Sequence, residues 1–190
     1  MNRQENLGVP YYTAPNLSEL SCLRHGFSTR AGGVSSGPCA TLNFGYLCEE
    51  NQENVRQNYF IFCRALGLNA EHLVLTHQTH TTNIRTVTTA DQGKGLLKVR
   101  DYTDIDGLVT DLPDTPLVIV SADCVPILFA DPVRRVIGGV HAGWQGTLHE
   151  IATKMVERMV NAFGDVYKRQ APARIAAKAL ATPQPKSLWQ

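Results

Sequence analysis

The chain has 190 residues, a formal net charge of +1, and 43% hydrophobic against 18% charged residues. This length suits one domain with a substantial core, and the composition is that of a globular protein rather than a disordered one. The sequence shows no basic block and no apolar run long enough to span a bilayer, which argues against nucleic-acid and membrane partners. Because the N-terminus lacks the apolar core of a signal peptide, we expect a cytoplasmic protein, and we expect a monomer.

The first half of the chain predicts few regular elements. Residues 23–51 are rich in glycine, serine and threonine and predict a strand, a long loop and a second strand. The following segment has apolar residues at near-helical spacing and stops at Gly67, which predicts a helix from Gln52 to Leu66. Residues 72–88 are dense in β-branched side chains on both sides of a polar turn, so two strands are expected there.

The second half predicts four strands and a helix. The strands are separated by turn residues, including Asp-Pro and Pro-Asp pairs, and are expected at Gly107–Thr110, Leu117–Ser121, Pro126–Ala130 and Val136–His141. The helix has apolar residues along one face from Ile151 to Phe163, and Gly164 predicts its end. Residues 165–190 are alanine-rich, basic and interrupted by prolines, and predict at most one short helix followed by a loose end.

The cysteines fit a reducing compartment. They are five in number, scattered and without a CxxC pair: Cys22, Cys39, Cys48, Cys63 and Cys124. This pattern indicates neither a disulfide framework nor a structural zinc knuckle, so most of them are expected to be small buried hydrophobic residues. Only Cys124, in the stretch SADCVP, stands in a context that suggests chemistry.

Three residues with metal-binding side chains stand where predicted strands end: His80, Cys124 and His141. One thiolate and two imidazoles suit Zn²⁺, with copper as an alternative, and three protein ligands with an open fourth position are typical of catalytic zinc. An open zinc ion lowers the pKa of a bound water and polarises a substrate atom. Each residue also has an ordinary explanation, because a thiol often packs in a core and a histidine at a turn often only forms hydrogen bonds.

The other histidines are weaker candidates. His77 lies in the same HQTH turn as His80 and is a rival ligand, although alternation directs the two to opposite faces of a continuous strand. The remaining three are expected to be solvent-exposed or capping residues: His25, His72 and His149.

Several motifs resemble the YfiH-like family in their order and wording: FSTRAGGVS, TLNFG, HQTH, DIDGLVT, ADCVPILFADP and HAGWQGT. They span most of residues 23–164, and ADCVPI together with HAGW is specific. That family is described as laccase-domain or polyphenol oxidase proteins and as peptidoglycan editing factor. The resemblance implies an α/β (α+β) fold, with residues 1–164 forming a single domain of mixed β-sheets sandwiched by helices, and residues 165–190 a divergent tail.

The resemblance also implies a function. It implies that His80, Cys124 and His141 hold one catalytic zinc ion, and that purine nucleoside and phosphate are the substrates. The implied activity is phosphorolysis of adenosine, inosine, guanosine and methylthioadenosine, together with deamination of adenosine. Attack of a zinc-activated water on C6 of adenine is compatible with this site, although the HxE signature of zinc deaminases is missing. The laccase description implies instead a copper-dependent oxidation of phenols.

Five further residues are candidates for a part in the site. Phosphorolysis needs an anion site, and Arg30 in STRAGGVSSG, with Asn43 nearby, is predicted to contact phosphate or substrate; a loop salt bridge explains Arg30 equally well. Asp123 is predicted to orient a ligand or act as a base, with turn capping as the alternative. Gln145 is predicted to contact substrate, and it stands where the family has arginine, which removes a cation near the site. Trp144 is interpreted as a wall for a flat base or as a core residue.

Other functions stay open. The tail does not resemble the continuation of the family, so a truncated or frame-disrupted product is expected, in which the metal ligands persist and the substrate pocket is incomplete. A copper-dependent polyphenol oxidase is the second enzyme, although six histidines without an HxH pair are few for a multicopper relay. A metal-free cysteine hydrolase would use Cys124 as nucleophile and His141 as base on peptidoglycan-related substrates. A metal-binding or interaction module is the non-enzymatic alternative.

Overall fold

The chain begins with a small antiparallel sheet. The computed structural model describes residues 1–46, 51–164 and 174–177. Strands β1 (Asn2–Asn6) and β2 (Val9–Thr13) form a hairpin, and β3 (Phe27–Ser28) pairs with β2. The hairpin was not predicted, because every residue of β1 is exposed and polar, so this strand carries no hydrophobic alternation.

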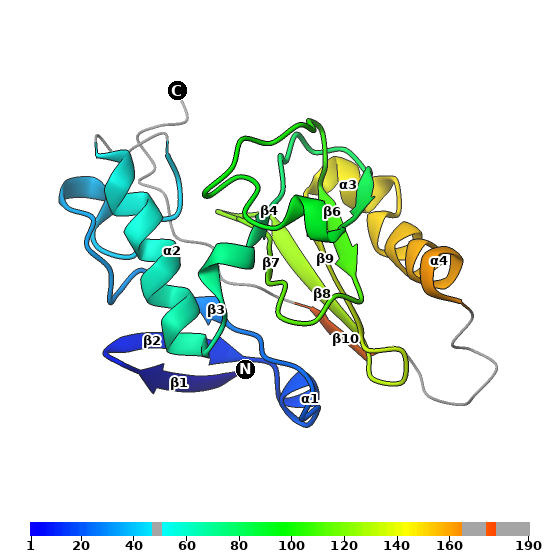
Figure 1. The fold of residues 1–190 in the computed structure, drawn as a ribbon, viewed down its shortest axis with the longest axis horizontal. Helices are drawn as coiled ribbons and strands as arrows, with labels where there is room; N and C mark the ends of the chain where they lie inside the picture. The colour runs from blue at the N-terminus through cyan, green and yellow to red at the C-terminus, as the bar shows by residue number, and fades with distance from the viewer. Residues whose placement is uncertain (47–50, 165–173, 178–190) are drawn as a thin grey trace.

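The main sheet has five strands in the order β10-β8-β9-β6-β5 (Figure 1). Their bounds are β5 (Ile84–Thr86), β6 (Gly107–Thr110), β8 (Val125–Asp131), β9 (Val136–Ala142) and β10 (Arg174–Ala177). β5 and β6 are parallel, whereas the other neighbouring strands are antiparallel. The strands predicted at the positions of β6, β8 and β9 are confirmed.

Within the tail of residues 165–190, the four described residues form a strand instead of the predicted helix. Residues 174–177 form β10 and pair with β8, so the expectation of a helix is wrong for these four residues. An open sheet edge offers unpaired backbone groups to a segment of weak intrinsic preference, and this pairing overrides an alanine-rich composition. The rest of the predicted tail lies outside the described residues.

A second, two-stranded parallel sheet is formed by β4 (Val74–Leu75) and β7 (Leu117–Val118). The strand expected at Leu117–Ser121 therefore ends three residues early. The physical reason is a side chain: the amide of Gln78 donates to the carbonyl of Val120 and accepts from the backbone N–H of Val120, taking the place of a strand partner.

Both predicted helices are confirmed. Helix α2 (Gln52–Leu66) begins after Asn51, whose side chain accepts the N–H of Glu53, and ends at Gly67 with φ of 66°. Helix α4 (Ile151–Phe163) ends at Gly164. Shorter helices are α1 (Pro15–Ser18) and α3 (Trp144–Leu148), and three 3-10 turns are η1 (Gly37–Cys39), η2 (Ala70–His72) and η3 (Thr89–Asp91).

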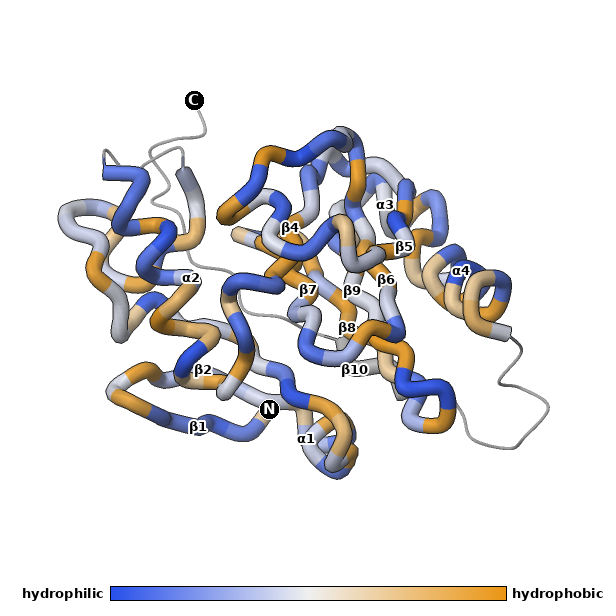
Figure 2. The backbone as a smooth tube through the Cα atoms, viewed as in Figure 1, coloured by the Kyte–Doolittle hydropathy of each residue, from blue (hydrophilic) through white to orange (hydrophobic). Residues whose placement is uncertain are grey.

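The elements stack in layers. Helix α4 covers one face of the main sheet, and on the other face β4 and β7 come first with α2 beyond them (Figure 1). The colours of Figure 2 show helices α2 and α4 alternating between hydrophilic and hydrophobic segments, as expected for helices with one buried face. The fold is thus the mixed α/β single domain that was predicted, with sheets between helices.

Two adjacent glycines of β9 set the spacing of these layers. A Cβ atom on Gly138 would lie 2.9 Å from Sδ of Met155 in α4, and one on Gly139 would lie 2.9 Å from Cγ1 of Ile119 after β7. The absence of side chains therefore lets both neighbouring layers approach β9 closely. Because strand residues alternate, His141 shares the face of Gly139 and points to the β7 side.

The cysteines only partly follow their prediction. Cys63 is buried in the core beneath α2, whereas Cys22 is exposed and Cys124 is intermediate; all three are free thiols. Cys39 is disulfide-bonded, although the spacing of the cysteines indicated no disulfide framework. None of the helices in the described ranges has the length and apolar character needed to cross a membrane.

Candidate metal centre

Three chain segments meet at one end of the sheets. The segment that carries His80 follows β4, and the segment that carries Cys124 follows β7, so the parallel pairing of β4 and β7 brings both to the same edge. Cys124 comes directly before β8, whose register pairs Pro126 with His141 near the end of β9. The topology thus gathers residues 80, 124 and 141 although they lie far apart in the sequence.

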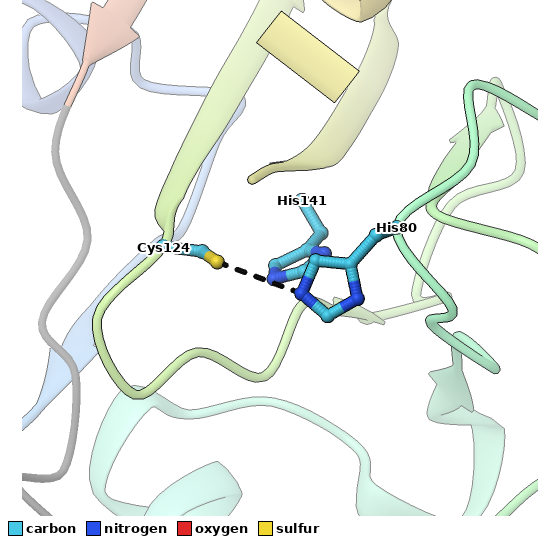
Figure 3. Close-up of side chains that lie close together, drawn as sticks. All are labelled: His80, Cys124 and His141. Atoms are coloured by element: carbon cyan, nitrogen blue, oxygen red, sulfur yellow. Dashed lines mark hydrogen bonds between the residues drawn. The ribbon is translucent and has the colours of Figure 1, made fainter. Parts of the chain in front are cut away.

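The three ligand atoms converge. One ligand atom from each of His80, Cys124 and His141 lies within 4.8 Å of the others, and Sγ of Cys124 is 3.8 Å from Nε2 of His80 (Figure 3). Ligands of tetrahedral zinc are about 3.5 Å apart, given Zn–S near 2.3 Å and Zn–N near 2.0 Å. Small side-chain movements would therefore close this set around one ion, and the donor types fit zinc or copper. No second cluster of this kind occurs within the described ranges.

A glycine makes room for the cluster. A Cβ atom on Gly143 would lie 2.7 Å from Cδ2 of His80 and 3.2 Å from Sγ of Cys124. Gly146, in the same HAGWQGT motif, is less crowded, because its Cβ would meet neighbours only at 3.4 Å or more. Of the two glycines, Gly143 is therefore the one that the approach of His80 and Cys124 requires.

A buried carboxylate lies behind the cluster. Asp106 is fully buried and its Oδ1 lies 2.9 Å from Nδ1 of His141. Burial alone would raise the pKa of Asp106, but hydrogen bonds from His141, Thr79 and Thr81 outweigh it and hold this pKa below its ordinary value. Asp106 is then ionised, so Nδ1 of His141 donates to it and Nε2 remains to bind a metal. The sequence did not identify Asp106; its only signal was its position directly before the buried strand β6, and Asp104 stands two residues earlier.

The other histidines lie outside the cluster. His77 accepts the backbone N–H of Asp104 through Nδ1 at 3.3 Å and forms a β-bridge with Ile105, so its ring is used locally. His25 is half-buried and accepts the N–H of Ala14 at 2.8 Å, and His149 is exposed at the end of α3. His72 lies 3.2 Å from the carbonyl oxygen of Asp114.

The remaining predicted residues are placed as follows. Asp123 is exposed beside Cys124. Burial raises the pKa of the Cys124 thiol, and the charge and hydrogen bond of Asp123 raise it further. Gln145 is exposed in α3, next to Trp144, whose side chain is 73% exposed and so is no core residue.

Arg30 and Asn43 are used within their own loop. The guanidinium of Arg30 donates two hydrogen bonds to the carbonyl of Ala40, at 2.9 and 2.7 Å. The side chain of Asn43 is buried and bonds both to the carbonyl and to the N–H of Gly45. A contact of either residue with substrate therefore stays a prediction.

Fold and cluster together define a mixed α/β protein with a candidate three-ligand metal site at the ends of its strands. Sequence comparison adds the family. The chain belongs to the family described as multi-copper polyphenol oxidoreductase laccase, whose sequence profile matches residues 24–177.

Relatives and solved structures agree with this assignment. A purine nucleoside phosphorylase of Deinococcus radiodurans is 39% identical over 154 residues, which are 81% of this chain and 55% of that protein. Purine nucleoside phosphorylase YlmD of Bacillus subtilis is 33% identical over 78% of this chain and 55% of its own length. The crystal structure of YlmD from Geobacillus stearothermophilus superposes with a TM-score of 0.76 at 33% identity, covering 93% of this chain and 64% of that one.

The resemblance to YfiH proteins is confirmed as well. A Bacillus licheniformis hypothetical protein YfiH has a TM-score of 0.73 at 35% identity, over 80% of this chain and 56% of that chain. The chain spans about half the length of the curated relatives that it matches.

Proposed function

We propose that this chain carries the metal centre of a zinc-dependent purine nucleoside phosphorylase. The observation that supports this most is the convergence of His80, Cys124 and His141 from three separate segments. The names of the relatives support the reaction, and the ligand set supports zinc. The proposed substrates are adenosine, inosine, guanosine and methylthioadenosine with inorganic phosphate, and adenosine deamination is a proposed second activity.

The chain's own residues suggest how the site would work. In phosphorolysis a phosphate oxygen forms a bond to C1′ of the ribose while the N-glycosidic bond breaks, and the leaving purine takes up a proton. Zinc, when held by the three ligands, supplies a Lewis acid that stabilises developing negative charge. Asp123, exposed beside Cys124, is proposed to deliver or accept the proton, and Gln145 and Trp144 to face the base. Arg30 and Asn43 are proposed for phosphate, which requires Arg30 to release the Ala40 carbonyl.

The metal-free cysteine hydrolase is less well supported. A nucleophilic cysteine normally has a lowered thiol pKa and a histidine base within hydrogen-bond reach. Here burial and Asp123 raise the pKa of the Cys124 thiol, and the histidine nitrogen in hydrogen-bond contact with Sγ is Nε2 of His80. Coordination by a metal, in contrast, deprotonates a thiol outright.

Zinc content and turnover test the proposal together. We expect about one zinc per chain in protein purified without added metal. Adenosine with phosphate should give adenine and ribose-1-phosphate, and Cys124→Ala should abolish both the zinc and the turnover. Cys22→Ala is the matched control, because Cys22 is a free, exposed thiol far from the ligands in sequence, and it should retain both. A Cys124→Ala protein with full zinc content would show that the ligand assignment is wrong.

The metal and the second activity are separated by product analysis. Copper in place of zinc, with oxidation of phenols, would favour the polyphenol oxidase suggested by the family description. Formation of inosine from adenosine in the absence of phosphate would support deamination. Adenine released only when phosphate is present would restrict the site to phosphorolysis.

A further inference from the structure

One buried carboxylate is shared by two of the three ligand segments. Oδ2 of Asp106 accepts the backbone N–H groups of Thr79 and Thr81 at 3.1 and 2.9 Å and the hydroxyl of Thr81 at 2.8 Å. Oδ1 accepts the N–H of His80 at 3.1 Å and Nδ1 of His141 at 2.9 Å. The same oxygen thus touches the backbone of one ligand and the ring of the other.

The turn that carries His80 needs this support. His80 has φ of 66°, a left-handed conformation that is unfavourable for a residue with a side chain. Three successive backbone N–H groups, those of Thr79, His80 and Thr81, point at the Asp106 carboxylate and form an anion-binding concavity around it. The carboxylate therefore stabilises a backbone conformation that would otherwise be strained.

The main chain of Asp106 is fixed as well. Its carbonyl accepts the N–H of His141 at 2.7 Å, and its N–H donates to the carbonyl of Asn83 at 3.0 Å. Asp106 lies directly before β6, which pairs with β9, so its position relative to His141 is set by the sheet. The pairing of β6 with β9 therefore fixes the position of Asp106, and the hydrogen bonds of Asp106 in turn fix the positions of His80 and His141.

We propose that Asp106 is the positioning residue of the metal centre: it fixes the Nδ1–H form of the His141 ring and holds the turn that presents His80 to Cys124. The inference rests on the proposed metal site. It gives Asp106, rather than the exposed Asp123, the task of orienting the ligands. On this proposal the two histidines are both positioned by Asp106. The cysteine is positioned separately, by the register of β8 and β9.

The conservative substitution Asp106→Asn should damage this arrangement. An amide keeps one acceptor oxygen but turns an NH₂ group toward backbone N–H donors, so it cannot satisfy all five hydrogen bonds at once. Zinc affinity should fall by about 10- to 100-fold, the effect typical of losing a partner behind a metal-bound histidine. Asp104→Asn is the matched control, because Asp104 bonds the hydroxyl of Thr79 in the same turn but is exposed and does not touch His141.

Two measurements test the proposal. The zinc dissociation constant is obtained by competition with a chromophoric chelator for the native protein, Asp106→Asn and Asp104→Asn. The ring tautomer of His141 is read from side-chain ¹⁵N shifts of the metal-free proteins near pH 8, above the ordinary histidine pKa of about 6.5. We expect Nδ1–H in the native protein and in Asp104→Asn, and a mixture with Nε2–H in Asp106→Asn.

The outcomes are distinct. Native zinc affinity or an unchanged His141 tautomer in a folded Asp106→Asn protein would overturn the proposal. If Asp106→Asn does not fold, Thr81→Val, which removes the hydroxyl donor to Oδ2 together with the contacts of that hydroxyl to the Asp104 carbonyl and the Asn83 N–H, should still weaken zinc binding; unchanged binding in that variant would also overturn the proposal. Failure of the native protein to bind zinc would instead refute the proposed metal site, and the tautomer measurement in metal-free protein would still decide whether Asp106 orients His141.

Discussion

Gly143 shows how a single hydrogen atom in place of a side chain can matter at the proposed metal centre. Its hypothetical Cβ would lie 2.7 Å from the His80 ring and 3.2 Å from Sγ of Cys124, so Gly143→Ala must push two ligands apart. We expect zinc affinity to fall by about tenfold or more, since metal sites need ligand distances within roughly 0.2 Å of their ideal values. The measurement is the zinc dissociation constant of the folded variant.

Gly146→Ala is the control for this substitution. Its Cβ would meet the carbonyl of His141 at 3.4 Å, an ordinary contact, and Gly146 lies in helix α3, where alanine is favourable. We expect unchanged zinc affinity. An equal loss in both variants would mean that the HAGWQGT segment as a whole, and not the space beside Gly143, is sensitive to substitution.

The convergence of the three candidate ligands was easier to predict than the residue that supports them. His80, Cys124 and His141 stand in distinctive motifs at strand ends, and the structure brings them together. The role of Asp106 was not predicted, because three of its five hydrogen bonds come from backbone N–H groups of a turn. The residue types in the sequence do not specify the backbone course of that turn. The sequence around Arg30 also did not indicate that its guanidinium donates a hydrogen bond to the carbonyl of Ala40.

At the level of elements, helix α4 packs on the main sheet through Met155, whose side chain lies against two glycines of the sheet. Met155 is fully buried, and its thioether approaches the positions where Gly107 of β6 and Gly138 of β9 lack side chains. Met155→Ala should leave a cavity that neighbouring strands cannot fill, and should lower the free energy of unfolding by about 2–5 kcal/mol. Urea denaturation measures this loss.

Glu157→Ala on the exposed side of α4 provides the comparison, and its effect should stay within about 0.5 kcal/mol. A loss of similar size in both variants would show that the effect does not come from the packing of Met155, and helix propensity cannot explain it because alanine is the better helix former in both cases. An unchanged stability of Met155→Ala would show that α4 does not depend on this contact.

Elements with a strong periodic signal were predicted well, and short elements were not. Helix α2 matches its predicted bounds because its apolar spacing, its Asn51 cap and the stop at Gly67 all agree. β7 is only two residues long because Gln78 takes over its hydrogen bonds, a long-range contact that the local sequence does not encode. β10 likewise depends on the free edge of β8 rather than on its own residues.

For the whole molecule, His25 and Asp91 are two of the groups whose shifted pKa values link stability to pH. Burial lowers the pKa of His25 from its ordinary value of 6.5, and its Nε2 accepts the N–H of Ala14, which requires a neutral ring. Asp91 is fully buried; burial alone would raise its pKa, but hydrogen bonds from Arg85, Lys94 and Thr88 outweigh this and hold it well below its ordinary value of 3.8. Arg85 and Lys94 also form ion pairs with Asp91.

The sign of both effects is the same. A histidine or a carboxylate with a lowered pKa in the folded state binds fewer protons there than in the unfolded chain at intermediate pH. The stability that each contributes is therefore present above its ordinary pKa and is lost as the pH falls. His25 acts first, below about pH 6.5, and Asp91 acts later, below about pH 4.

We therefore predict a two-stage loss of stability on acidification of the metal-free protein, measured as the free energy of unfolding in urea from about pH 8 to pH 3. His25→Gln should remove the first stage, because the glutamine amide oxygen can still accept the N–H of Ala14 but does not titrate. His149→Gln should leave both stages intact, because His149 is exposed. Metal is kept out by a chelator, since protonation of the zinc ligands would add its own pH dependence. A first stage that persists in His25→Gln would assign it to another histidine.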